Sequence, residues 1–348
     1  MKSLDIRIIL PKDFPSITSD FAEIKGVLPS KCNTMLSVLN WRFYDNPLGQ
    51  GIFAGAFSGA KLVATAGITV KSFAIKGTPV MGAEIGDTIT HPDFRGMGAF
   101  SSLVRYLLKA AAEKGFHIIY GTPNQMSGQI YLNKLDFVPL FHWDTLARPI
   151  NWNCLGVLAG TPGKIAGSVL GPVCNLLLPL KLGEYQYSVD ENMHPDLKSF
   201  LTQACYNCEC SIDRTPNYIR WRFNRPDRQY FQIYLRDKNG ELRGWAVIGY
   251  VTEGDIRFSH VRIGDFWITP KKRGVLKALL AAIMIEGKRK GVDMICAVCR
   301  TKKTSNIFKS LGFFAKPSIM PLIAIAPIGY DLKQFEKWQY RDSDADMF

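Results

Sequence analysis

The sequence predicts an α/β (α+β) protein of two similar domains, each a mixed, mainly antiparallel sheet flanked by helices. Three observations support this fold class. The chain has 348 residues, a length that suits two domains. Its 47% hydrophobic and 21% charged residues are typical of a globular protein and exclude disordered, collagen-like and coiled-coil chains. Sequence blocks of the first half also recur in the second half, which indicates that one fold occurs twice.

The internal repeat consists of collinear blocks at a nearly constant offset. Trp-Arg-Phe at 41–43 recurs at 221–223, about 180 positions later. Gly86-Asp87, Pro92 and Arg95-Gly96 recur 178 positions later, and Lys114-Gly115 recurs 176 positions later. Leu135-Asp136-Phe137 has the counterpart Leu311-Gly312-Phe313, also at an offset of 176. We therefore expect domains at 1–150 and 187–328, an apolar linker at 151–186 and a C-terminal tail at 329–348.

Each copy predicts the same order of elements. A short helix ends near the Trp-Arg-Phe block, and a β-hairpin follows, with strands at 51–57 and 61–73 in the first copy and at 230–236 and 241–251 in the second. A third strand, 80–90 or 261–268, leads through an Arg-Gly loop into a helix. The first of these helices has an apolar stripe of Phe100, Leu103, Val104, Leu107, Leu108 and Ala111. A strand at 116–120, a short helix to Leu135 and a strand at 137–147 complete the first copy.

The loop Arg95-Gly96-Met97-Gly98 at a helix start carries the clearest chemical signal. Two glycines one residue apart let successive backbone N–H groups point at one anion, and the helix dipole adds positive potential there. The loop lacks the Gly-Lys-Ser/Thr end of a P-loop and the spacing of a dinucleotide-binding loop. The pattern therefore predicts a different kind of phosphate-binding loop.

This segment resembles the Gln/Arg-x-x-Gly-x-Gly/Ala hallmark of the GNAT superfamily of acyl-CoA-dependent N-acyltransferases, in its tandem form, with Phe100 departing from the last position. The resemblance covers both halves. It implies an N-acetyltransferase that takes acetyl-CoA as cosubstrate, needs no metal, and acts on a small primary amine such as an amino sugar. The CoA contacts it implies are Ile89, Thr90, Arg95, Gly96, Met97, Gly98, Ala99, Phe100, Ser101, Asn124 and Ser127.

The second copy is expected to be degenerate. The offset falls from 178 to 176 between Arg273-Gly274 and the following helix, which predicts that the counterparts of Met97-Gly98 are missing. A shortened loop cannot present the same backbone amides. We therefore expect CoA to bind the first half, and the second half to shape the acceptor pocket.

Three residues are candidates for proton transfer. The resemblance implies Glu84 as a base acting through water, with Asp87 as the alternative. Strand alternation predicts that these two lie on opposite faces, and the recurrence of Asp87 as Asp265 favours a structural role for it. Tyr131 is the candidate acid, although counting back from Leu135 reaches Leu132 instead, and a core anchor is its alternative role. The terminal carboxylate of Phe348 is a remote candidate base.

The formal net charge of +13 favours polyanionic ligands without choosing among them. An aminoacyl-tRNA-dependent peptidyl transferase of cell-wall type is an alternative function that this charge would suit. The intact CoA loop argues against it, so no nucleic-acid partner is expected. A non-catalytic CoA-binding or scaffold protein is the other alternative, and the oligomeric state stays open.

Cysteines and apolar segments complete the sequence-based expectations. Cys205-x-x-Cys208-x-Cys210 and Cys296-x-x-Cys299 have zinc-like spacing, but the second pair falls in a predicted strand, so no metal is expected. The chain start lacks a secretory pattern and eight cysteines are few, which predicts a cytoplasmic protein. The uncharged segment 165–180 is too short for a membrane span. A buried linker is favoured for it, with an interfacial membrane patch as the alternative.

Overall fold

A computed structural model describes residues 4–26, 28–177, 180–206, 208–252, 258–270 and 274–345. The chain divides into two compact units, each built from three stretches of sequence. The first unit consists of Met1–Phe141, Glu209–Arg228 and Ile319–Trp338, and the second of His142–Cys208, Gln229–Ser318 and Gln339–Phe348. Each unit contains one mixed, mainly antiparallel sheet with helices, which confirms the predicted fold class.

The sheet of the first unit has the strand order β1-β2-β3-β4-β5-β15-β6, with β9 paired to β3. The strands are β1 (Asp5–Ile8), β2 (Ile52–Ser58), β3 (Lys61–Ile75), β4 (Thr78–Thr90), β5 (Ile118–Gly121), β6 (Val138–Phe141), β9 (Cys210–Ile212) and β15 (Leu322–Ile325). Neighbours are antiparallel except β4 and β5, which are parallel. The predicted β2–β3 hairpin is confirmed.

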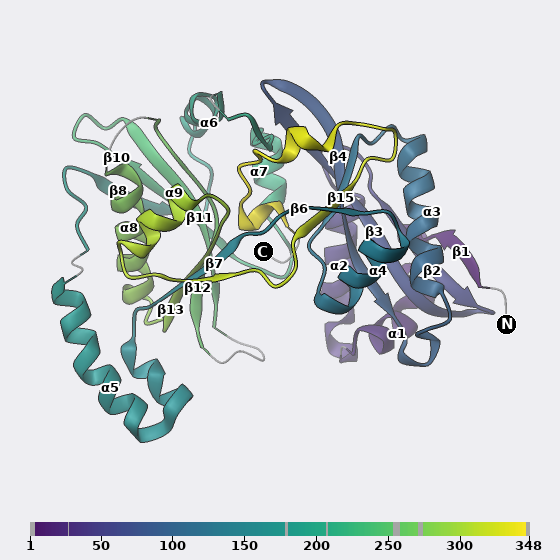
Figure 1. Ribbon diagram of the computed structural model, residues 1–348, viewed down its shortest axis with the longest axis horizontal. Helices are drawn as coiled ribbons and strands as arrows, with labels where there is room; N and C mark the ends of the chain where they lie inside the picture. The colour runs from purple at the N-terminus through teal and green to yellow at the C-terminus, as the bar shows by residue number, and fades with distance from the viewer. Residues whose placement is uncertain are drawn as a thin grey trace. The chain divides into compact units, whose positions relative to one another are not determined.

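Helices cover both faces of this sheet (Figure 1). They are α1 (Phe14–Lys25), α2 (Cys32–Phe43), α3 (Ala99–Glu113), α4 (Gln125–Lys134) and α7 (Pro216–Arg222). Strand β2 shows how alternation separates two cores. Ala54 and Ala56 join the core beneath α3, whereas Phe53 and Phe57 join the core beneath α1 and α2.

The sheet of the second unit has the order β14-β7-β13-β12-β11-β10-β8. Its strands are β7 (Asp144–Pro149), β8 (Gln186–Asp190), β10 (Tyr230–Arg236), β11 (Leu242–Val251), β12 (His260–Ile268), β13 (Met294–Cys299) and β14 (Phe314–Pro317). Its helices are α5 (Leu155–Leu177), α6 (Leu197–Tyr206), α8 (Val275–Arg289) and α9 (Lys302–Lys309). β12 and β13 form the parallel pair, as β4 and β5 do in the first unit.

The predicted single strand 137–147 is wrong. The chain leaves extended pairing at His142 and Trp143, so β6 and β7 belong to different sheets. β7 pairs with β13, with Leu146 opposite Ala297. In exchange, β15 from the end of the chain lies between β5 and β6, where Figure 1 shows it in yellow. The compact units therefore cut across the contiguous boundaries expected at 150, 186 and 328.

The segment 165–180 is not the buried linker that the sequence favoured. Residues 165–177 belong to α5, and Ile165 and Val169 are exposed there. Among the described residues, no helix combines the length and the apolar character needed to cross a bilayer.

Candidate active site

The turn from β4 to α3 has the geometry expected of a phosphate-binding loop. A short 3-10 helix, Pro92–Phe94, follows β4, and α3 begins at Ala99. Gly96 and Gly98 have φ angles of 77° and 82°, and a Cβ at either position would have nothing within 4 Å. Glycine is therefore required at both by the left-handed backbone and not by lack of space.

The first turn of α3 offers backbone donors to an anion. The N–H groups of Ala99, Phe100 and Ser101 have no acceptor four residues earlier in the helix. The positive end of the helix dipole lies at the same place. These groups fit a phosphate, so the residues predicted to hold the CoA pyrophosphate are grouped at one helix end.

The edge of β4 beside this loop is open to a ligand. β4 pairs with β5 only over Gly82–Glu84, although it continues to Thr90 alongside β3. Among the described residues, the later part of β4 has no strand partner on the β5 side. The Thr90 hydroxyl is buried without a hydrogen-bond partner there, and the Thr90 carbonyl accepts from Arg95 Nε at 3.3 Å. An extended ligand such as pantetheine could add to this edge as a strand does.

Glu84 is buried on the face of β4 that α2 and α7 cover. Its side chain is 2% exposed, and Oε2 lies 3.3 Å from Nζ of Lys71, which is itself 1% exposed. Burial raises the pKa of Glu84 above its ordinary value, although the cations Lys71, Arg42 and Arg222 oppose this. A carboxylate with a raised pKa is better suited to accept a proton near neutral pH.

Asp87 lies on the same face as Glu84, so the predicted opposite faces are wrong. Arg42 Nε donates to Thr69 Oγ1 at 2.7 Å, and Thr69 is the cross-strand partner of Glu84. Arg42 also reaches Asp87 at 2.6 Å. The reason is a β-bulge, because the β3–β4 register shifts between Thr65 and Gly67 and Asp87 has a φ of 47°. A bulge inserts one residue and so reverses the alternation beyond it.

The charges around Asp87 keep it ionised. Burial would raise its pKa, but Arg42 and Lys25 outweigh burial and hold the pKa of this carboxyl well below its usual range. Lys25 Nζ lies 2.6 Å from Asp87 Oδ1. A carboxylate held this firmly is a weak proton acceptor, which fits the structural role that its recurrence as Asp265 suggested.

Tyr131 reaches β4 from α4. Its hydroxyl lies 3.2 Å from Thr88 Oγ1, and its ring packs against Phe100 and Phe137 with centroids 5.2 Å and 4.8 Å away. Burial raises its pKa to about 12, so the phenol is protonated and can donate. Asn124 caps α4, as predicted, by accepting from the backbone N–H of Ser127 at 2.8 Å.

The buried cations of this site are absent from the sequence-based prediction. Lys71, Arg42 and Arg222 all act on Glu84. The one available signal was a lysine within the apolar run of β3, where a buried charge needs a partner. Arg42 and Arg222 come from the two Trp-Arg-Phe blocks, and no sequence pattern placed both blocks in one unit.

The second unit differs at the matching helix start. Gly274 has a φ of 86° and precedes α8 as Gly98 precedes α3, so Gly98 does have a counterpart. The prediction that the counterparts of Met97-Gly98 are missing is therefore wrong for Gly98. Residues 271–273 of that loop lie outside the described residues.

The C-terminal segment packs where β12 and β13 diverge. Residues 341–345 are buried, and Arg341 Nε donates to the Phe266 carbonyl of β12 at 3.2 Å. Arg341 also acts on Cys299 of β13, where it opposes the effect of burial, which raises the pKa of that thiol. Asp342 pairs with Arg262. Phe348, the remote candidate base, lies outside the described residues.

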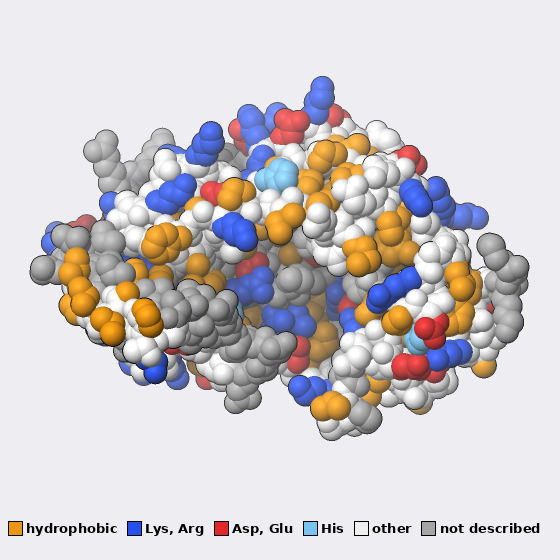
Figure 2. Space-filling view, turned by 60° about the horizontal axis from the view of Figure 1, so that its bottom comes forward, with side chains coloured by type: hydrophobic (Ala, Val, Ile, Leu, Met, Phe, Trp, Pro, Cys, Tyr) orange, Lys and Arg blue, Asp and Glu red, His pale blue; other side chains and the backbone are white. Residues whose placement is uncertain are grey.

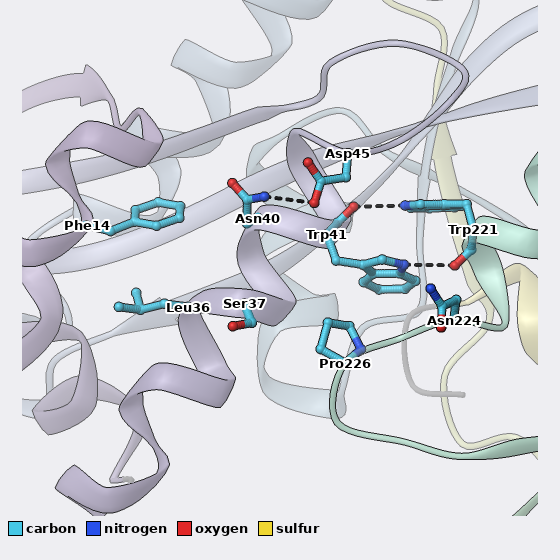
Figure 3. Close-up of a pocket in the computed structure, with 9 residues that line it drawn as sticks. All are labelled: Phe14, Leu36, Ser37, Asn40, Trp41, Asp45, Trp221, Asn224 and Pro226. Atoms are coloured by element: carbon cyan, nitrogen blue, oxygen red, sulfur yellow. Dashed lines mark hydrogen bonds between the residues drawn. The ribbon is translucent and has the colours of Figure 1, made fainter.

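A pocket of about 690 Å³ lies between α1, α2 and the α7 region of the first unit (Figure 3). Its lining residues are Phe14, Leu36, Ser37, Asn40, Trp41, Asp45, Trp221, Asn224 and Pro226. Trp41 and Trp221 stack at 4.8 Å, and each indole N–H donates to the other's backbone carbonyl at 2.8 Å. The carboxylate of Asp45 accepts from Asn40 at 2.7 Å.

Metal ligands do not gather in the part of the chain that the structure describes. No three His, Cys, Asp or Glu side chains lie close enough there to hold an ion. Cys296 and Cys299 lie in β13, the strand predicted for them.

Comparisons with known proteins concern the family and the fold. Residues 31–134 match the family model described as an acetyltransferase (GNAT) domain. No curated protein matches the chain by sequence. A GCN5-related N-acetyltransferase from Anabaena variabilis is similar in structure, with a TM-score of 0.65 and 12% identity over 93% of this chain and 73% of that one.

Two further solved structures resemble the whole chain. A tandem GNAT protein from the clavulanic acid biosynthesis pathway has a TM-score of 0.61 at 12% identity, over 94% of this chain and 100% of that one. Saccharomyces cerevisiae N-myristoyltransferase with bound myristoyl-CoA has a TM-score of 0.63 at 14% identity, over 93% and 78%. Residues 31–134 therefore form an acetyltransferase domain of the GNAT family, within a chain that has the fold of tandem GNAT proteins.

Proposed function

We propose that this chain is an acyl-CoA-dependent N-acyltransferase that transfers an acetyl group to a primary amine within a ternary complex. One observation carries the proposal. The first unit combines the left-handed Gly96/Gly98 loop with an open β4 edge, and that same strand carries Glu84. The loop and the edge suit the pyrophosphate and pantetheine of CoA.

The proposed reaction is a direct attack by the amine. The amine nitrogen bonds to the thioester carbonyl carbon, and the carbon–sulfur bond then breaks. Glu84 takes the amine proton through a water molecule, and Tyr131 gives its phenolic proton to the leaving sulfur. Solvent restores both groups. Asp87 holds Arg42 and Lys25 in place. The step needs neither a metal nor a covalent enzyme intermediate.

We propose that the Trp41–Trp221 pocket receives the acceptor. It contains indole surfaces, hydroxyl and amide groups, and the exposed carboxylate of Asp45. These groups suit a hydroxylated amine such as an amino sugar, because aromatic faces pack on a sugar ring and a carboxylate pairs with an ammonium group. The residues next to the two tryptophans, Arg42 and Arg222, are two of the three cations that act on Glu84.

The direct test is acetyl transfer to a library of amines, read by mass spectrometry together with release of free CoA thiol. A product that gains one acetyl group is expected. CoA binding without turnover on any amine would favour the non-catalytic alternative. For the acceptor pocket, Asp45→Asn should raise KM for the amine about tenfold while kcat and CoA affinity stay unchanged. An unchanged KM would remove the pocket from the proposal.

A further inference from the structure

Helix α5 of the second unit presents three of its described apolar side chains outward. Its side chains at Ile165, Val169 and Val173 are 63%, 61% and 46% exposed, whereas Gly163, Gly167 and Gly171 are buried. Residues four apart share one side of a helix, so the aliphatic residues form an exposed stripe and the glycines form the inner side. A surface helix usually has the reverse arrangement.

The inner glycines have a structural reason. Gly160 has a φ of 62°, a left-handed conformation within α5, and Figure 1 shows that α5 bends back on itself. A Cβ at Gly156 would lie 2.4 Å from Cγ of Lys164, and one at Gly171 would lie 3.4 Å from Trp152. The two parts of the segment thus approach closely on the glycine side. That side has no room for Ile165, Val169 or Val173, which leaves them facing away from the unit.

The charged side chains next to this stripe in the sequence are basic. Residues 145–183 contain no Asp or Glu, while exposed Lys164 and Lys181 flank the apolar run. In Figure 2, hydrophobic side chains gather at the left edge of the view, in the region of α5. The chain as a whole carries a formal charge of +13.

We propose that α5 rests on the surface of an anionic lipid bilayer. Ile165, Val169 and Val173 would enter the boundary between headgroups and acyl chains, and the flanking lysines would contact anionic headgroups. An acid-free apolar stripe with basic flanks complements such a surface in both polarity and charge. A second copy of this chain suits the stripe less well, because a symmetric contact would bring like charges together.

The experiment is co-sedimentation of the full chain with vesicles of phosphatidylcholine alone and with phosphatidylglycerol added. Binding is expected only to the anionic vesicles, and it should weaken at high salt. The double variant Ile165→Asp/Val169→Asp should lower the bound fraction at least tenfold, roughly the effect of losing inserted apolar area and adding repulsion. Lys164→Glu should weaken binding mainly at low salt.

Ile319→Asp/Ile328→Asp is the matched control, because both isoleucines are exposed, at 72% and 46%, and belong to the first unit. This variant adds the same two charges and should bind as the parent does. Equal loss in both double variants would show a general charge effect and overturn the proposal. Equal binding to both vesicle types would also overturn the proposal. So would a dimer that forms without lipid and that the Ile165→Asp/Val169→Asp variant dissociates. Thermal melts check that each variant is folded.

Discussion

The parallel pairs β4–β5 and β12–β13 occupy matching places in the two units, yet different groups lie where each pair opens. The first pairs over Gly82–Glu84 and the second over His260–Ile263. Past Glu84, the β4 edge has no strand partner among the described residues. Past Arg262, residues 341–345 pack against β12 and β13.

The two units also differ at the position of the proposed base. The residue 178 positions after Glu84 is Arg262, so the carboxylate proposed as base is replaced by a cation. Arg262 then pairs with Asp342 from the chain's own C-terminal segment. The C-terminal segment thus closes the second opening, although Gly274 still precedes α8 there. We therefore expect that the glycine alone does not make a CoA site.

The largest expected effect concerns the segment that closes the second opening. Asp342→Asn should lower the free energy of unfolding by about 3 kcal/mol, because it removes the charge that compensates a mostly buried guanidinium. Lys337→Ala breaks the exposed pair with Glu209 and should cost less than about 1 kcal/mol. Urea unfolding measures both. Equal small losses would mean that the segment contributes little to the second unit.

The next effect separates catalysis from packing in the first unit. Tyr131→Phe should lower kcat about 10²-fold with the CoA Kd unchanged, because it removes the proposed acid. Tyr234→Phe is the matched control in the second unit, where burial also raises the pKa of the tyrosine to about 12. It should leave kcat unchanged. Full turnover in Tyr131→Phe, with only a lower melting temperature, would assign Tyr131 to the core.

A smaller effect compares the two helix starts directly. Gly98→Asp should weaken CoA binding about 30-fold, or about 2 kcal/mol, because it places a carboxylate beside the pyrophosphate. Gly274→Asp imposes similar backbone strain, since the φ angles are 82° and 86°. It should leave CoA affinity unchanged. Calorimetry that finds two CoA sites per chain, or equal loss in both variants, would refute the difference between the units.

The sequence predicts most elements because their signals are local. The β2–β3 hairpin, the stripe of α3 and the cap of α4 at Asn124 each depend on neighbouring residues. The exchange of β7 and β15 between sheets depends on long-range pairing that no local pattern encodes. The bulge at Asp87 is likewise not encoded by a local pattern, because it is defined by the register between β3 and β4.

In the candidate site too, local features are predictable from the sequence and long-range contacts are not. Gly96 and Gly98 are predictable because only glycine adopts their backbone conformation without strain. Lys71, Arg42 and Arg222 are not, because their effect on Glu84 arises from three elements that meet only in the folded unit. The difference at the second opening can be predicted only in part. The repeat shows that Arg262 stands in place of Glu84, but no sequence pattern shows where residues 341–345 pack.

The smallest effect is a pH dependence at Glu84. Its pKa is raised by burial, so the proposed base loses activity as pH falls through that raised value and keeps it above. Glu84→Gln should therefore lower kcat/KM by about tenfold or more at pH values above the raised pKa of Glu84, where the parent carboxylate is ionised and the amine is still protonated. The deficit should disappear as pH falls through that pKa, because Glu84 of the parent is then protonated as well. The deficit should shrink as pH rises and free amine accumulates.

A structural account of Glu84 predicts something else, because Glu84→Gln also leaves Lys71 buried without its counter-charge. The double variant Lys71→Met/Glu84→Gln removes both charges and should recover much of the lost stability. If Glu84 is the base, the double variant stays slow at pH values above the pKa of Glu84, although its melting temperature recovers. If Glu84 only balances Lys71, activity returns with stability at every pH, and the first unit then works without a dedicated base.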